Sequence, residues 1–379
     1  MTSRQNIFFI PLTIGLSLAA SLLIGETAVR LFVPQSQWKF RDATSDWALN
    51  KRMGWVQKPN LDVVTHSDFG WTVRFQTNED GLTPPSARRV KKEGALRIMF
   101  FGDSTVVGRS VPQDKTVSAQ LEQLLQRKGI HAEVFNAGVQ GYSTDQVLLR
   151  MEEFLPLYQP DIVFYGACDN DFSGNVSRVS YGQAKPMFRL KEDGELEEIP
   201  PELKEEINSF GGGWGKWLQY SALYRFLQPT LVSLRAQMGG WRERNLLGIA
   251  SEIYYQPKSL DQIDWPIFAA LVRRMNRVAE ENRARFFFYS HPAIAEVWDP
   301  YIRDTERKLR LAAGQYDRYA LERHLKKVAE ETETEFIPLI DYFAARQSEG
   351  PFHLLPRDPH CNSKGNQLTA EALTQSVTH

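Results

Sequence analysis

The feature that most constrains the fold is a regular alternation of short apolar runs and longer amphipathic runs, beginning near Ala95. Five apolar runs have the length of buried β-strands: residues 95–102, 132–138, 160–166, 284–292 and 334–343. Five stretches have helical periodicity: residues 116–129, 144–158, 265–283, 319–332 and 363–377. Strands that alternate with helices in this way predict an α/β three-layer sandwich with a five-stranded parallel sheet.

The N-terminus is apolar, with no charged residue between Arg4 and Glu26. As a helix, residues 5–25 would span roughly 31 Å, which is enough to cross the bilayer core. We therefore expect a transmembrane anchor over residues 1–33. A cleaved signal peptide is the alternative, because Ala and Ser are frequent in the second half of the run. More basic residues follow the span than precede it, and that count alone would place the globular part in the cytoplasm.

Three further regions follow the anchor. Residues 34–94 read as a strand-rich lead-in with many turn formers, and residues 95–379 as the sheet domain. The alternation of strands and helices in that domain is interrupted at about 173–260, where we expect a helical, aromatic-rich insertion. Its aromatic stretch, 214–241, fits a helix packed on the core, a lid or pocket wall, or a surface lying against lipid.

Composition excludes several classes of function. The 45 Lys and Arg residues balance 46 Asp and Glu residues, so no nucleic-acid partner is implied. The two cysteines, Cys168 and Cys361, rule out a disulfide scaffold and a CxxC-type metal site, although a single disulfide between them remains open beside two free thiols. No GxGxxG or Walker loop follows the first strand, which argues against a nucleotide-binding protein.

Polar blocks follow four of the predicted strands. They are Gly102-Asp103-Ser104, residues 136–144, residues 166–171 and residues 357–366. Ligands of open parallel sheets bind outside the carboxyl ends of the strands, so we expect the four blocks to meet at one edge. His291 ends the fourth strand at that edge and is open to three roles: a structural histidine, a substrate contact or a rival base.

Together these blocks resemble the SGNH, or GDSL-type, serine hydrolase family and its membrane-linked bacterial branch. The resemblance runs from about Leu96 to the C-terminus, interrupted by the insertion, and implies a flavodoxin-like sheet with ester chemistry at its carboxyl edge. It implies that Ser104 is the nucleophile. Gly141 and Asn170 match the oxyanion-hole positions, and Asp358 and His360 match the remaining catalytic pair.

Two positions depart from the family pattern. Cys168 stands where the third block often has glycine, which leaves Asp169 as an alternative to Asn170. Asp358 and His360 are separated by one residue where the family often has two.

The chemistry of these residues is coherent. A serine hydroxyl needs an adjacent base, which His360 supplies, and Asp358 can hold the imidazole tautomer. The Ser104 amide, the Gly141 amide and the Asn170 side chain can stabilise the oxyanion. No metal or cofactor is required.

The sequence therefore predicts a membrane-anchored serine esterase or O-acyltransferase that acts on an acylated carbohydrate or cell-envelope polymer through an acyl-serine intermediate. The membrane-linked relatives imply an inner-membrane, single-pass protein whose catalytic domain faces the periplasm or cell exterior. They also suggest a membrane acyltransferase or polysaccharide-export partner. The alternative is a non-catalytic scaffold or carbohydrate-binding subunit of an envelope polysaccharide assembly complex.

Overall fold

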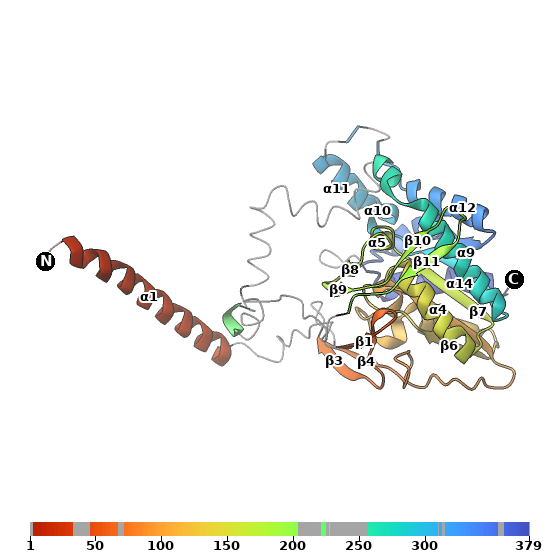
Figure 1. The fold of residues 1–379 in the computed structure, drawn as a ribbon, viewed down its shortest axis with the longest axis horizontal. Helices are drawn as coiled ribbons and strands as arrows, with labels where there is room; N and C mark the ends of the chain where they lie inside the picture. Colours follow the sequence, from red (N-terminus) through yellow and green to blue (C-terminus); the bar gives the residue numbers. More distant parts are fainter. Residues whose placement is uncertain are drawn as a thin grey trace. The chain divides into compact units, whose positions relative to one another are not determined.

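The computed structural model describes residues 3–32, 46–66, 72–203, 221–224, 227, 257–309, 311–312, 315–354 and 360–378 (Figure 1). The chain divides into two compact units. One comprises Met1–Asp42 and Asn208–Leu247, and the other comprises Ala43–Ile207 and Gly248–His379. The second unit contains the sheet and the candidate site.

The second unit is built on a parallel sheet of five strands, as the sequence predicts. The strands are β5 (Leu96–Gly102), β6 (Ala132–Asn136), β7 (Ile162–Ala167), β12 (Arg285–Ser290) and β13 (Glu335–Ile337). Their order across the sheet is β13-β12-β7-β5-β6, and all four neighbouring pairs are parallel. Strand β5, which precedes Ser104, therefore lies inside the sheet between β7 and β6.

Helices cover both faces of this sheet (Figure 1). The principal ones are α3 (Val117–Arg127), α4 (Thr144–Tyr158), α9 (Trp265–Glu281), α12 (Ala320–Thr332) and α14 (Ser363–Thr378). Successive β5 side chains point to opposite faces. Ile98 and Phe100 join the core cluster that contains residues of α3 and α14, whereas Met99 and Phe101 join the cluster with α4, α9 and α12. Two separate hydrophobic layers thus hold the sheet in place.

The last strand is shorter than the sequence suggests. Of the predicted run 334–343, only Glu335–Ile337 pairs with β12, and a short helix, α13 (Ile340–Ala344), follows. Pro338 comes directly after the strand and has no N–H to donate to the ladder, which accounts for the early end.

The lead-in contains two antiparallel hairpins, formed by β1 (Trp47–Asn50) with β2 (Gly54–Gln57), and by β3 (Asp62–His66) with β4 (Thr72–Gln76). It packs into the same core as the sheet. Trp55 is fully buried and stacks on Trp47 at a ring distance of 5.2 Å. Thr83 exchanges two backbone hydrogen bonds with Asn136 at the end of β6. The lead-in thereby reaches the carboxyl edge of the sheet.

The described start of the insertion forms hairpins where the sequence suggests helix. A short helix, α5 (Asp169–Gly174), leads into β8 (Val179–Ser180) paired with β9 (Gln183–Ala184). Strands β10 (Met187–Leu190) and β11 (Leu196–Ile199) form a second hairpin. Tyr181 and Gly182 both have positive φ, as a two-residue hairpin turn requires. The aromatic stretch 214–241 lies outside the described residues except for 221–224 and 227.

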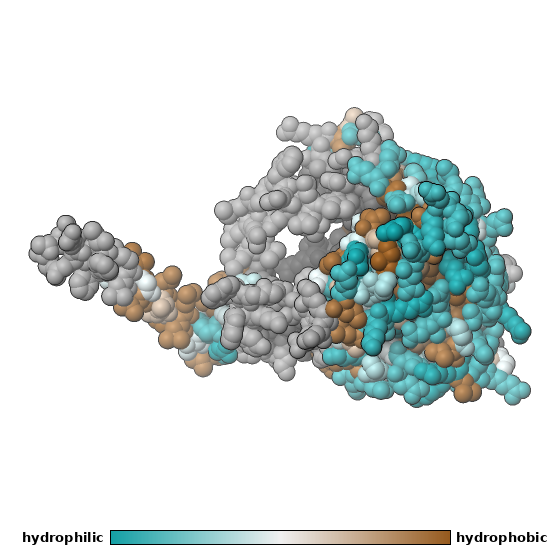
Figure 2. Space-filling view, in the orientation of Figure 1, coloured by the Kyte–Doolittle hydropathy of each residue, from teal (hydrophilic) through white to brown (hydrophobic). Residues whose placement is uncertain are grey.

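In the other unit, the N-terminus is a long helix, α1 (Ser3–Phe32). Within the described part of the chain, Thr13–Phe32 is the one helical stretch long and apolar enough to cross a membrane, with a mean hydropathy of 1.5. Large apolar side chains such as Leu23 and Ile24 are more than two-thirds exposed along it (Figure 2). A membrane anchor and a signal sequence both meet this description.

Glu26, near the end of α1, binds the described part of the aromatic stretch. Its carboxylate accepts hydrogen bonds from the Ser221 hydroxyl at 2.7 Å and from the backbone N–H groups of Ala222 and Leu223 at 2.9 Å each. A Cβ on Gly25 would lie 3.0 Å from a Leu223 methyl carbon, so the two segments are also in tight apolar contact.

Candidate active site

Ser104 begins a short helix directly after β5. Asp103 caps that helix, α2 (Ser104–Val107), because its Oδ1 accepts hydrogen bonds from the Thr105 N–H at 2.8 Å and the Thr105 hydroxyl at 2.7 Å. The turn is crowded. A Cβ at position 102 would lie 2.4 Å from a Val106 methyl carbon, so a glycine is needed there. This turn leaves the Ser104 hydroxyl at the carboxyl edge of the sheet.

The structure brings Ser104 and His360 together, as the sequence predicts. Ser104 Oγ lies 2.8 Å from His360 Nε2, although the two residues are 256 positions apart. An imidazole that carries its proton on Nδ1 accepts the serine proton at this Nε2. The pair therefore has the geometry of a hydroxyl and its general base. Asp358 lies outside the described residues, so its contact with His360 stays a prediction.

Gly141 lies in the loop between β6 and α4, and its surroundings require a glycine. Its φ is +78°, and a Cβ would lie 2.5 Å from the Tyr181 ring. Its carbonyl accepts a hydrogen bond from the Ser180 hydroxyl at 3.1 Å. On the lead-in side, the Trp55 indole N–H donates to the Gln140 carbonyl at 3.1 Å. The Gly141 loop is thus held by both neighbouring hairpin regions.

Asn170 reaches the Ser104 turn from α5. Its side-chain amide donates a hydrogen bond to Asp103 Oδ2 at 3.2 Å. Asp169, the alternative that the sequence leaves open, instead accepts a hydrogen bond from the Cys168 thiol at 3.4 Å, and burial raises the pKa of its carboxyl. An amide can donate to an oxyanion, whereas a carboxylate cannot. These contacts favour Asn170.

Beneath α5, a buried polar network links the third block to α4. Asp171 Oδ2 accepts hydrogen bonds from the Cys168 N–H and the Tyr165 hydroxyl, each at 2.9 Å. The Tyr165 oxygen also lies 3.0 Å from Thr144 Oγ1. Burial raises the pKa of Asp171 well above its usual range, with the nearby Asp103 charge acting in the same direction. The network fixes where α5 begins.

His291 is buried and makes no hydrogen bond to Ser104. Its Nδ1 lies 3.9 Å from Cys361 Sγ, and its ring packs edge-on against Tyr289. Burial lowers the pKa of His291 to about 3, so the ring is neutral near pH 7. These contacts argue against the rival base, which would have to reach Ser104. They are compatible with a structural histidine and with a substrate contact.

The two cysteines are free thiols. Burial raises the pKa of Cys361 to about 12 and that of Cys168 well above its usual value, so both are protonated near neutral pH. In the parts of the chain that the structure describes, no group of three His, Cys, Asp or Glu side chains is arranged to hold a metal ion.

A serine hydroxyl that is hydrogen-bonded to an imidazole, at the carboxyl edge of a flavodoxin-like sheet, is typical of enzymes that hydrolyse esters or transfer acyl groups. The chain belongs to the GDSL-like lipase/acylhydrolase family, whose model matches residues 100–368. That range includes Ser104, Gly141, Asn170 and His360.

Solved structures that the chain matches include TesA, at 12% identity and a TM-score of 0.39, covering 74% of this chain and 97% of that one. An acetyl xylan esterase, AlAXEase, is 16% identical with a TM-score of 0.39 and coverage of 74% and 99%. The esterase EstA from Pseudoalteromonas sp. is 12% identical with a TM-score of 0.38 and coverage of 75% and 97%. No curated protein matches the chain significantly. The family assignment therefore rests on the family model.

Three residues at the site were not predicted from the sequence. Trp55 comes from the lead-in, and Tyr181 and Lys185 come from the first hairpin of the insertion. The Tyr181-Gly182 pair carries a weak turn signal. Nothing in the sequence around Lys185 indicates burial, because a lysine is ordinarily exposed.

Proposed function

We propose that this protein is a serine esterase in which Ser104 is the nucleophile and His360 the general base. The 2.8 Å contact between Ser104 Oγ and His360 Nε2 carries the proposal. As Ser104 Oγ bonds to the acyl carbon of an ester, its proton passes to His360 Nε2. His360 then protonates the departing alcohol. Water attacks the acyl-serine with the same residue as base, which releases the acid and restores Ser104.

The negative charge that develops on the carbonyl oxygen needs donors fixed in advance. We assign that role to the backbone N–H groups of Ser104 and Gly141 and to the Asn170 side-chain amide. One such donor is worth about 3–4 kcal/mol of the activation barrier. We assign to Asp358 the orientation of His360 and the balancing of its positive charge during transfer.

For the substrate, we propose an acylated carbohydrate or cell-envelope polymer. The support comes from the surface beside the site. Tyr181 is 45% exposed, and its ring lies against Gly141 and packs edge-on against Trp47 at a ring distance of 6.3 Å. An aromatic ring with one apolar face and a polar tip is suited to a sugar, which is apolar on its faces and polar at its rim.

We further propose that α1 anchors the protein in the inner membrane and that the catalytic unit faces the periplasm or cell exterior. The exposed apolar length of Thr13–Phe32 supports the anchor. In that setting a sugar hydroxyl can replace water as the acceptor of the acyl group. A second form of this proposal is therefore that the protein is an O-acyltransferase. In that form it works with a membrane acyltransferase or polysaccharide-export partner.

The proposal is tested by treating the detergent-solubilised protein with a fluorophosphonate probe and, separately, with p-nitrophenyl acetate. We expect the wild type to be labelled and to hydrolyse the ester, and we expect Ser104→Ala to do neither. Labelling without hydrolysis would indicate the acyltransferase form. Wild-type protein that neither labels nor hydrolyses would favour a non-catalytic scaffold or carbohydrate-binding subunit.

A further inference from the structure

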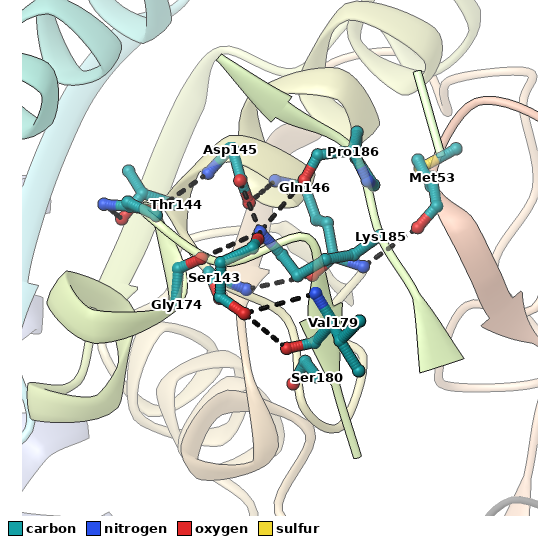
Figure 3. Close-up of polar contacts among 12 residues, drawn as sticks. Met53, Ser143, Thr144, Asp145, Gln146, Gly174, Val179, Ser180, Lys185 and Pro186 are labelled. Carbon is teal, nitrogen blue, oxygen red and sulfur yellow. Dashed lines mark hydrogen bonds and ion pairs between the residues drawn. The ribbon is translucent and has the colours of Figure 1, made fainter. Parts of the chain in front are cut away.

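A buried cation, Lys185, takes no direct part in the proposed chemistry. Its ammonium is fully buried and forms an ion pair with Asp145. It also donates hydrogen bonds to the backbone carbonyls of Gly174 at 2.9 Å, Pro186 at 3.0 Å and Ser177 at 3.1 Å. Figure 3 shows Asp145, Gly174 and Pro186 around this ammonium. Burying an ion pair adds little net stability compared with apolar side chains of similar volume. The role of such a pair therefore depends on which segments it joins.

Two of the acceptors around Lys185 belong to the segments that carry the two proposed oxyanion donors outside the Ser104 turn. Asp145 is in the first turn of α4, four positions after Gly141. Gly174 is the last residue of α5, four positions after Asn170. Because one ammonium binds both segments, it fixes their separation.

The same two segments also contact each other directly and pack closely together. The Asp145 N–H donates to Asn175 Oδ1 at 3.4 Å, and Asn175 Nδ2 donates to Thr144 Oγ1 at 3.0 Å. A Cβ on Gly174 would lie only 1.9 Å from Ser143 Oγ. A displacement of either segment is therefore passed on to the other.

Lys185 also holds the hairpin that covers Gly141. Its backbone N–H donates to the Arg178 carbonyl at 2.9 Å, which closes the hairpin of β8 and β9. From that hairpin, Ser180 donates to the Gly141 carbonyl, and the Tyr181 ring packs on Gly141. The ammonium itself binds the carbonyls of Ser177 and Pro186, which lie just before β8 and just after β9. It therefore acts on Gly141 both through α4 and through the hairpin.

We infer that the Lys185–Asp145 ion pair is a positioning device for the oxyanion hole, acting through Gly141 and Asn170. The inference rests on the proposed esterase function. Neither side chain touches the substrate or the reacting atoms. Loss of the pair should displace the two donors relative to Ser104, and so weaken an interaction made in the transition state.

The chain offers a matched control at the amino end of the same sheet. The Arg97 guanidinium is also fully buried and pairs with a single carboxylate, that of Glu133. It too donates to three backbone carbonyls, those of Arg89, Val90 and Tyr158. Arg97 is the second residue of β5, so this pair lies at the end of the strand away from Ser104.

The test compares Lys185→Met with Arg97→Met in the full chain, measured below the unfolding midpoint of both. We expect both variants to unfold at lower temperature. With p-nitrophenyl acetate, Lys185→Met should lower kcat by about 10- to 100-fold with KM changed less than about threefold. Arg97→Met should keep kcat within about threefold. The fluorophosphonate labelling rate should follow kcat.

A second comparison shows whether the effect passes through the oxyanion hole. If it does, Lys185→Met should cost much less kcat in an Asn170→Ala background than in the wild type. If Lys185→Met does not fold, Asp145→Asn takes its place, with Glu133→Gln as the control, because both substitutions keep the size of the side chain.

The possible outcomes are distinct. Unchanged kcat in folded Lys185→Met, an equal loss in Arg97→Met, or independent losses in the double variant would overturn the inference while leaving the esterase function intact. A wild type without turnover or labelling would instead overturn the proposed function.

Discussion

The side-chain amide of Asn170 donates a hydrogen bond to the carboxylate of Asp103, the residue that caps the helix beginning at Ser104. The donor proposed for the oxyanion is therefore held against the nucleophile turn before substrate arrives. Because the turn and α5 are joined in this way, an acyl group bound at Ser104 in the proposed mechanism would meet an amide that is already in place.

Asn170→Ala should accordingly lower kcat by about two to three orders of magnitude, since one oxyanion donor among several is lost. KM should change little. The matched control is Ser173→Ala on the exposed side of the same short helix, for which kcat should stay near the wild-type value. Steady-state kinetics on both variants checks the prediction, and equal effects would point to a disturbance of α5 as a whole.

Ser104→Ala and His360→Ala should each reduce turnover by several orders of magnitude, and the double variant should be scarcely worse than either single one. The reason is that a nucleophile and its base act as one unit. Ser104→Ala should change the free energy of unfolding by no more than about 1 kcal/mol, because the oxygen that it removes lies outside the hydrophobic core. Losses that multiply in the double variant would show that the two residues act separately.

Gly141→Ala should reduce activity, whereas Gly129→Ala should not. Both glycines have φ near +78°, so each substitution carries a similar backbone strain of about 1 kcal/mol. Only at position 141 does the added Cβ collide with a neighbour, the Tyr181 ring, because nothing lies within 4 Å at position 129. Thermal unfolding and kcat of the two variants separate strain from the effect on the site. Equal kcat would argue against Gly141 as an oxyanion donor.

Acidification should destabilise the protein through His291. Burial lowers the pKa of its imidazole from 6.5 to about 3. The unfolded chain therefore binds a proton below pH 6.5 that the folded chain does not accept. The contribution of His291 to the free energy of unfolding is therefore fully present above pH 6.5. It is lost as the pH falls toward 3, by up to about 1.4 kcal/mol per pH unit. Denaturant unfolding between pH 7 and 4 should show a shallower loss for His291→Gln than for the wild type.

Deletion of the residues before Val33 should release a soluble, folded catalytic unit if α1 is the only segment that meets lipid. The sheet core begins at Leu96 and does not depend on α1 for its strands. Size-exclusion chromatography without detergent is the measurement. The control is a second variant that also replaces residues 208–247 with a Gly/Ser linker. Aggregation of the first variant alone would show that the aromatic stretch also contacts lipid.

Much of the sheet was predictable, because strands buried on both faces read as continuous apolar runs bounded by turns. All five strands were found in this way. Their ends were less well predicted where one residue overrides the apolar pattern, as Pro338 does after β13. The hairpins that follow α5 were not predicted, since their strands are only two to four residues long and half exposed.

The candidate site was predictable to the extent that its side chains follow strands. Ser104, Gly141 and Asn170 lie in the loops or short helices that follow β5, β6 and β7, and a parallel sheet brings such positions to one edge. Lys185 could not be found by this logic. Its partners Asp145 and Gly174 are 40 and 11 positions away, and only the folded chain turns an ordinarily exposed side chain into a buried one.

The hydrogen bonds from Ser221, Ala222 and Leu223 to Glu26 determine how deep these three residues would lie in the bilayer. If α1 crosses the bilayer as proposed, a carboxylate near its end belongs at the boundary between hydrocarbon and water. Residues 221–223 are bound to that carboxylate and must then lie at the same boundary. The chain would thus meet the membrane surface twice, at two places separated by nearly two hundred residues of sequence.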